Sequence, residues 1–277
     1  MYNTEMDHIL IELFDELLNV YTPISILPND YPRENLNLLK DELYDNWNIF
    51  NLEKDMIYRL ITNICKEKYM NSPEFFDTSL GIIESKQESY LINNSILKTY
   101  NWDDFVIAIK SENRFHTNYV NTDALEIFCS YVRKSYKVGT IFYRARISDK
   151  NGFSIDDMGA PPHELASAGR ANPEGISHLY LSSDVLTTLK EIRSGAYDYV
   201  TVGKFVLKQD IDIVDLTSID QISAFSELNC TQHAINKKHL RKINNEIAKP
   251  LRRHDSPLDY LPTQYIADFN KKHKERY

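Results

Sequence analysis

Hydrophobic side chains in residues 1–136 recur every three or four positions, which is the period of an amphipathic helix. Proline interrupts this pattern at Tyr31-Pro32 and Ser72-Pro73, because the residue before proline is disfavoured in a helix. The apolar stripes are Ile9, Leu10, Leu13, Phe14, Leu17 and Leu18; Leu36, Leu39, Leu43 and Trp47; Met56, Ile57, Leu60, Ile61 and Ile64; and Ala124, Leu125, Phe128 and Val132. The sequence therefore predicts an all-helical N-terminal bundle.

The pattern changes near residue 138. Thr140–Tyr143 is β-branched and aromatic, and a long polar loop rich in glycine and proline follows it. Further on we expect strands at His178–Leu181, Tyr199–Leu207 and Ile211–Leu216, and helices at Ser183–Arg193 and Leu258–Lys272. The fold class predicted is α+β, with a helical domain over 1–137 and a small mixed α/β domain over 138–277.

Composition limits the classes of function. Of the 277 residues, 42% are hydrophobic and 26% charged, which is typical of a globular protein. The apolar runs are too short to span a bilayer and Met1–His8 lacks a basic secretory leader, so we expect a cytoplasmic protein without a membrane partner. A net charge of -8 argues against nucleic acid as a partner.

Three basic stretches are local exceptions: Lys237–Lys242, Lys249–His254 and Lys271–Arg276. We expect each to face solvent, and the alternative is that they help to steer an anionic ligand. Three widely separated cysteines and unpatterned histidines predict neither a disulfide framework nor a metal site.

Candidate chemistry lies between residues 142 and 191. Arg144 and Arg146 fall on one side of the predicted strand, Arg170 lies between Gly169 and Ala171 in the loop, and Tyr180 and Glu191 follow. Each has an ordinary structural alternative. Arg144 could pair with an internal carboxylate such as Asp149 or Asp157, Arg170 and Glu191 could be solvated, and Tyr180 could be a core residue.

These residue types suit the cleavage of NAD. Nicotinamide leaves as a neutral group from a cationic ring, so the oxocarbenium-like ribose is what must be stabilised, and a fixed carboxylate can do so. Arginine binds a pyrophosphate better than lysine does, and an aromatic wall can pack against the pyridinium ring.

The order and spacing of these residues resemble the RES domain, a family of NAD-degrading toxins. The shared pattern is an aromatic-Arg strand from Phe142, a Gly-Arg loop, a tyrosine strand, a helical glutamate and the segment Leu258–Gln264. The resemblance implies a fold like that of ADP-ribosyltransferases, preceded by a HEPN-like helical region. NAD would be the substrate, with no separate cofactor.

By the same resemblance, Glu191 and Arg144 are the catalytic residues, and Arg170 and Tyr180 bind the substrate. Glu191 would hold the ribose, the two arginines would contact phosphates, and Tyr180 would line the nicotinamide side. The family also implies a toxin or defence effector. The partners expected besides NAD are a neutralising antitoxin or immunity protein, and a second copy of the chain in a homo-oligomer.

The sequence departs from the family at its end. A strand ending in the third signature residue, a serine, would follow Leu258–Lys272, but the sequence stops at Tyr277. Neither Ser226 nor Ser256 has the matching context. The sequence is therefore expected to carry a RES domain without its C-terminal strand and serine, and NAD binding is better supported than turnover.

The same residues also fit two alternative functions. They are ADP-ribosyl transfer to a macromolecule and a catalytically incomplete module that binds NAD or a partner. A HEPN-type ribonuclease is disfavoured, because Arg114-Phe115-His116 is too short for the Arg-to-His spacing of those enzymes.

Overall fold

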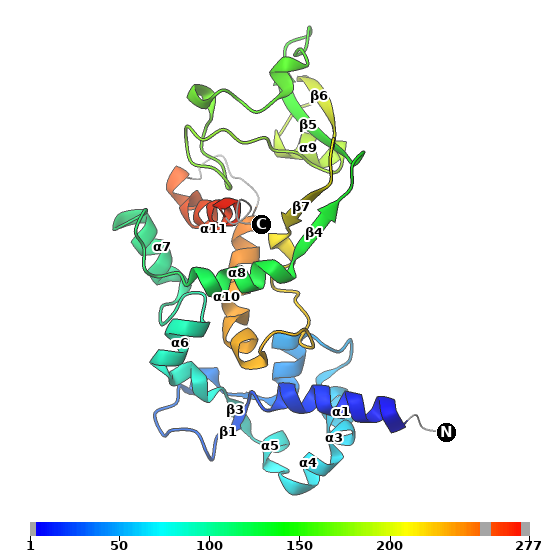
Figure 1. Cartoon of the computed structure of the whole chain (residues 1–277), viewed down its shortest axis with the longest axis vertical. Helices are drawn as coiled ribbons and strands as arrows, with labels where there is room; N and C mark the ends of the chain where they lie inside the picture. The colour runs from blue at the N-terminus through cyan, green and yellow to red at the C-terminus, as the bar shows by residue number, and fades with distance from the viewer. Residues whose placement is uncertain (1–3, 250–255, 273–277) are drawn as a thin grey trace. The chain divides into compact units, whose positions relative to one another are not determined.

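The computed structural model describes residues 4–249 and 256–272 (Figure 1). They form two compact units that interleave along the chain. The first contains residues up to Trp102, Asn118–Leu125 and Asp220–Lys242; the second contains Asp103–Thr117, Glu126–Ile219 and the residues from Ile243 onward. The two units are therefore not separated by a single boundary in the sequence. The division into domains over 1–137 and 138–277 stays a prediction.

Helices dominate the first unit, as the apolar stripes predicted. They are α1 (Thr4–Leu18), α2 (Leu39–Asp41), the π-helix η2 (Glu42–Trp47), α3 (Lys54–Ile64), α4 (Lys66–Asn71), α5 (Glu74–Asp77) and α6 (Glu88–Asn94), with short 3-10 helices η1 (Arg33–Asn35) and η3 (Ile83–Lys86). The core contains most of the predicted stripe residues, among them Phe14, Leu17, Leu39, Leu43, Ile57 and Ile61.

The prediction of an all-helical bundle is wrong. Three very short strands form an antiparallel sheet in the order β1-β3-β2: β1 (Thr22–Pro23), β3 (Ser79–Gly81) and β2 (Asn37–Leu38). Strands of two or three residues are too short to show the alternation that identifies a strand in a sequence. Gly81 lets Tyr31 pack closely, since a Cβ at this position would lie 2.7 Å from the tyrosine ring.

A fourth strand, β4 (Arg133–Tyr136), also lies within the range predicted to be helical. Its residues are mostly exposed and polar, so no hydrophobic alternation marks it. It pairs antiparallel with β7 (Ile211–Val214), and the register joins Arg133 to Val214 and Tyr136 to Ile211.

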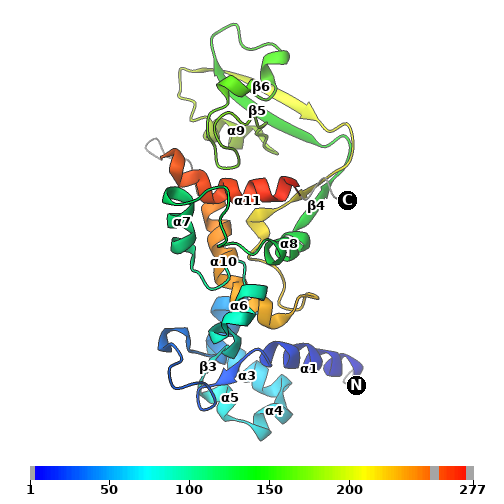
Figure 2. The ribbon, with the colours of Figure 1, turned by 60° about the vertical axis from the view of Figure 1, so that its left-hand side comes forward.

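The second unit combines β4 and β7 with a longer ribbon of β5 (Ile141–Ser148) and β6 (Tyr199–Val206). Figure 2 shows this ribbon with α9 (Val185–Glu191) beside it, and α9 packs against β5. The other helices of the second unit are α7 (Trp102–Ser111), which belongs to this unit from Asp103 onward, and α11 (Leu261–Lys272). Its 3-10 helices are η4 (Asp156–Met158), η5 (His163–Leu165), η6 (Leu216–Ser218) and η7 (Pro257–Tyr260). Two helices, α8 (Thr122–Tyr131) and α10 (Cys230–Ala248), contribute residues to both units.

The α+β class and most predicted elements are confirmed, but the predicted strand at His178–Leu181 is wrong. Only Ser182 forms a bridge, through two backbone hydrogen bonds of 2.7 and 2.9 Å with Tyr143 of β5. The preceding residues have the composition of a strand, yet they run as irregular chain whose side chains are partly exposed. Likeness to ADP-ribosyltransferases stays a prediction.

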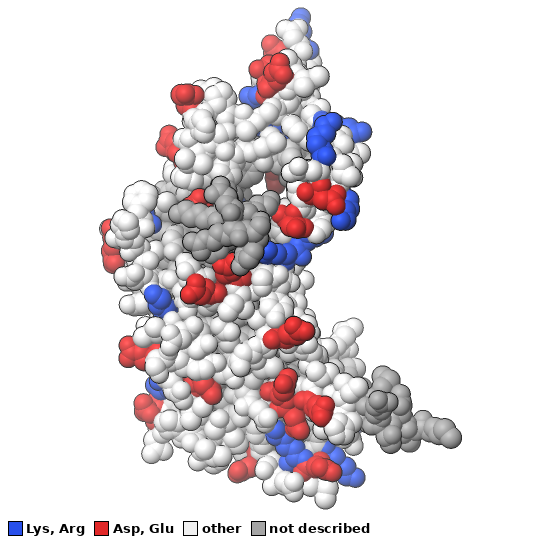
Figure 3. Space-filling model, viewed as in Figure 1, with Lys and Arg blue, Asp and Glu red and all other residues white. Residues whose placement is uncertain are grey.

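Charge is mixed over the surface seen in Figure 3, where acidic side chains are scattered and basic ones form small groups among them. That face does not carry the continuous basic surface typical of nucleic-acid binding. In the part of the chain that the structure describes, no helix combines the length and apolarity needed to cross a bilayer.

Candidate functional site

The loop after η5 is organised around the buried side chain of Asn172. Its amide nitrogen donates hydrogen bonds to the carbonyls of Ser167, Pro173 and Ile176 at 2.9–3.1 Å. Its amide oxygen accepts a hydrogen bond of 2.5 Å from the Tyr180 hydroxyl. Asn172 is 3% exposed, so this network fixes both ends of the loop and the position of the tyrosine.

Helix α11 holds the same loop from a second direction. Gln264 Nε2 donates to the carbonyls of Gly169 (2.7 Å) and Asn172 (2.9 Å). The Thr263 hydroxyl donates to the carbonyl of Arg170 at 2.9 Å. The Thr-Gln pair, noted in the sequence only as part of a family resemblance, therefore has a physical role in positioning the Gly-Arg loop.

Tyr180 combines a fixed hydroxyl with an accessible ring. The backbone N–H of Ala171 also donates to its hydroxyl, at 3.3 Å, yet the residue is 45% exposed, which excludes the core position considered from the sequence. Gly169 permits this arrangement, because a Cβ there would lie 2.6 Å from the Tyr180 hydroxyl oxygen. Burial raises the pKa of Tyr180, and the carboxylate of Glu191 raises it further.

Glu191 lies at the end of α9 and is exposed. Asp184 begins this helix by accepting a hydrogen bond of 2.8 Å from the backbone N–H of Thr187. Thr188 is the buried residue of this helix, with 5% of its surface exposed. The negative charge of Glu191 acts on Tyr180 by raising the pKa of its hydroxyl.

Arg170 is bound to backbone rather than solvated. Its Nη1 donates to the carbonyls of Glu246 (2.8 Å) and Ile247 (3.2 Å) in the last turn of α10. A cation at this end of a helix satisfies free carbonyls and complements the helix dipole. Arg170 therefore has a structural role at the end of α10.

Arg144 lies in the middle of β5, opposite Gly203 of β6. Its guanidinium donates to the carbonyl of Met158, at 3.0 Å, and to that of Gly159. These partners are main-chain carbonyls rather than the carboxylates of Asp149 or Asp157. Burial, followed by the positive charge of Arg146, lowers the pKa of Arg144.

The absence of a side chain at Gly203 makes room for the segment that holds Arg144. A Cβ on Gly203 would lie 3.1 Å from Cε of Met158, which is 5% exposed. Arg146, on the same side of the strand, places its guanidinium 4.0 Å from the ring centre of Phe153. The two arginines are thus fixed against the loop over 153–159.

The structure thus joins Arg170 and Tyr180 through one loop and its contacts, whereas Arg144 is held by a different segment and Glu191 lies at the end of α9. Sequence reasoning missed the roles of Asn172 and Gln264. The available signal was sequence position: Asn172 follows Arg170 by two residues, and Gln264 ends the segment Leu258–Gln264. A cavity of about 590 Å³ in the same unit reaches Ala171 and is lined mainly by β7, α8 and α11. Within residues 4–249 and 256–272, no group of three His, Cys, Asp or Glu side chains has metal-binding geometry.

We predict that Gln264→Met destabilises the fold by removing two hydrogen bonds to the Gly-Arg loop. The variant keeps the shape of the side chain, which is 6% exposed, but leaves the carbonyls of Gly169 and Asn172 without their donor. A loss of about 1–3 kcal/mol in the free energy of unfolding is expected, measured by urea denaturation. The same change at the exposed Gln209 should have little effect; equal losses at both positions would contradict this role.

Comparison with known proteins identifies the part of the chain that contains this loop. Residues 141–274, just under half of the chain, match the RES domain family. This segment is similar to a RES domain. It includes Arg144, Arg170, Tyr180 and Glu191, as well as Asn172 and Gln264. No curated protein and no solved structure matches the chain significantly.

Proposed function

We propose that the RES domain cleaves the nicotinamide–ribose bond of NAD, with phosphate or water as the acceptor. The observation that carries this proposal is the family match over a segment that contains all four predicted site residues. The chain would act as a toxin or defence effector in the cytoplasm by depleting NAD, and a neutralising partner protein would keep it in check.

The chemistry assigned to each residue follows from its surroundings. Glu191 is exposed on α9, so its carboxylate can reach the ribose hydroxyls and offset the positive charge that develops as nicotinamide leaves. The half-exposed ring of Tyr180 offers a face for the pyridinium. Arg170, and Arg144 on its strand, supply permanent positive charge for the phosphates.

Fixed positions matter for this chemistry, because electrostatic stabilisation of a transition state depends on groups that do not need to reorganise. Gln264 donates to two carbonyls of the Gly-Arg loop, and Asn172 accepts a hydrogen bond from the Tyr180 hydroxyl; these bonds supply that rigidity. We therefore assign Asn172 and Gln264 as positioning residues rather than catalytic ones.

The test is the NAD content of cells in which the chain is expressed from an inducible promoter. Wild-type protein should lower NAD by about tenfold or more, and Glu191→Ala should leave it unchanged. Glu164→Ala, a matched change at an exposed glutamate of η5, should deplete NAD like the wild type. Depletion by Glu191→Ala at equal soluble protein would contradict the proposal.

The reaction products in the same cultures show whether phosphate or water is the acceptor. ADP-ribose 1″-phosphate as product indicates phosphorolysis, and free ADP-ribose indicates hydrolysis. Label transferred from NAD to protein or nucleic acid would instead establish ADP-ribosyl transfer and overturn the proposed reaction.

A further inference from the structure

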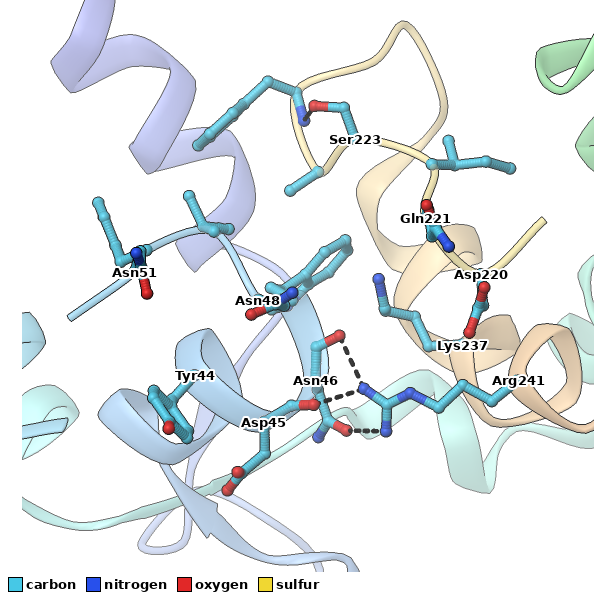
Figure 4. A pocket seen from close by; sticks show the side chains of 16 residues that line it. Tyr44, Asp45, Asn46, Asn48, Asn51, Asp220, Gln221, Ser223, Lys237 and Arg241 are labelled. Atoms are coloured by element: carbon cyan, nitrogen blue, oxygen red, sulfur yellow. Dashed lines mark hydrogen bonds between the residues drawn. The ribbon is translucent and has the colours of Figure 1, made fainter. Parts of the chain in front are cut away.

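A second pocket lies in the first unit, among residues that take no part in the NAD chemistry proposed above. It is lined by residues 44–51, which include the end of η2, by the loop 220–225, and by Lys237 and Arg241 of α10. Its volume of about 870 Å³ is within the range of small-molecule sites. Figure 4 shows both cationic side chains reaching from α10 towards the segment that carries Asn46 and Asn48.

Lys237 is the main feature of this pocket. It was expected to face solvent, but it is 6% exposed, with Nζ 4.8 Å from the centre of the Trp47 ring. The other two basic stretches of the sequence, Lys249–His254 and Lys271–Arg276, lie largely outside the described residues. Across the described chain, no carboxylate lies within ion-pair distance of the Lys237 ammonium. A buried ammonium is costly without a compensating anion, and its contact with the indole offsets only part of that cost.

The groups around Lys237 are held in place. Trp47 Nε1 donates to the Tyr21 hydroxyl at 2.6 Å, and that hydroxyl donates to Glu42 at 3.0 Å, which fixes the indole ring. Arg241 donates to the side-chain oxygen of Asn46 at 3.1 Å and to the Asn46 carbonyl at 3.0 Å. The guanidinium is therefore a rigid part of the pocket wall.

We propose that this pocket binds a small molecule that carries a phosphate group, through Lys237 and Arg241. Two cations, the carboxylates of Asp45 and Asp220, and the polar side chains of Asn48, Gln221 and Ser223 line one cavity. A phosphate offers several acceptor oxygens and a double negative charge near pH 7, which the buried Lys237 and the fixed Arg241 can meet. The aromatic residues Phe50 and Phe225 provide apolar walls, and the volume accommodates an organic part up to the size of a nucleotide. This inference does not depend on the NAD reaction.

The pH dependence of binding follows from the setting of Lys237. Burial, followed by the charge of Arg241, lowers the pKa of Lys237 to about 8, and the opposing effect of Asp220 is smaller. The other titratable groups around the pocket are His233 on α10 and Tyr44 and Asp45 on η2. Burial lowers the pKa of His233 to about 3, so it stays neutral from pH 7 to 9. Phosphate binding should therefore weaken as pH rises through 8.

The experiment titrates the full chain with inorganic phosphate, ribose 5-phosphate and adenosine monophosphate, and follows the fluorescence of Trp47. The chain has two tryptophans, so Trp102→Phe leaves Trp47 as the reporter. The three probes distinguish free phosphate from a sugar or nucleotide phosphate as the preferred source. Saturable binding of at least one probe is expected, weaker by about tenfold or more in Lys237→Met.

The exposed Lys238, next along α10, provides the matched control, and Lys238→Met should bind like the wild type. The wild-type chain should also bind more weakly at pH 9 than at pH 7, a measurement that needs no substitution. The proposal is overturned if none of the three probes binds saturably, or if Lys237→Met and the wild type bind equally.

Discussion

Glu191→Gln is expected to lower the rate of nicotinamide release from NAD by about 100-fold or more, while the chain remains folded. Glutamine keeps the shape and hydrogen-bonding capacity of the side chain but removes the negative charge that would stabilise the ribose cation. Because Glu191 is exposed, the free energy of unfolding should change by less than about 0.5 kcal/mol.

Kinetic and binding data together distinguish this role from a structural one. If Glu191 acts in the transition state, kcat falls while the Kd for NAD changes by less than about threefold. The pKa of Tyr180 should also fall, since the Glu191 carboxylate helps to raise it, and ultraviolet titration against a Tyr180→Phe reference measures this change. Glu164→Gln is the matched control, and equal rate losses in both variants would exclude a specific role for Glu191.

Acid is expected to unfold the first unit, because two histidines that are buried in its core must take up protons as the pH falls. His233 is 1% exposed and His239 is 4% exposed, and burial lowers the pKa of each to about 3. In the unfolded chain both rings have the usual pKa of about 6.5. The unfolded state therefore binds more protons between these two values, and folded stability falls as pH decreases through this window.

The expected slope is large. Two such groups together cost about 2–3 kcal/mol of unfolding free energy per pH unit within the window, once the pH is well below 6.5. Since a domain has about 5–15 kcal/mol in total, we expect cooperative unfolding between roughly pH 5 and 3. Urea denaturation at a series of pH values, followed by tryptophan fluorescence, measures the slope.

A substitution assigns the effect to the buried rings. His239→Leu should reduce the slope by about half, because one of the two proton-binding groups is then absent from the unfolded state. His116→Leu, at an exposed histidine, should leave the slope unchanged. An unchanged slope in His239→Leu would show that other groups cause the acid sensitivity.

The sequence predicted the elements whose signal is local. Phe14, Leu43 and Ile57 of the helical stripes are buried as expected, and the strand patterns at β6 and β7 are confirmed. Other members of the same stripes are exposed, namely Ile9, Leu10, Met56 and Leu60. Sequence reasoning failed where pairing depends on distant chain. The strand β4 is polar and exists because β7 pairs with it, and β1, β2 and β3 are too short to have a pattern.

The candidate site was only partly predictable for the same reason. Tyr180 and Glu191 could be chosen from their order in a motif, and the charge of Glu191 raises the pKa of Tyr180. The contacts of Arg170 with α10, and of Gln264 with the loop, join residues that are 76 to 95 positions apart. No local sequence pattern encodes such a contact. The carbonyl partners of both arginines and the positioning role of Gln264 could therefore be identified only from the structure.

The most direct test of the central claim is nicotinamide release by the purified chain incubated with NAD, with and without phosphate. Our account predicts nicotinamide and an ADP-ribose product in equal amounts, formed over many turnovers by the wild type and not by Glu191→Gln. Intact NAD after prolonged incubation with folded wild-type protein, in either buffer, would contradict it.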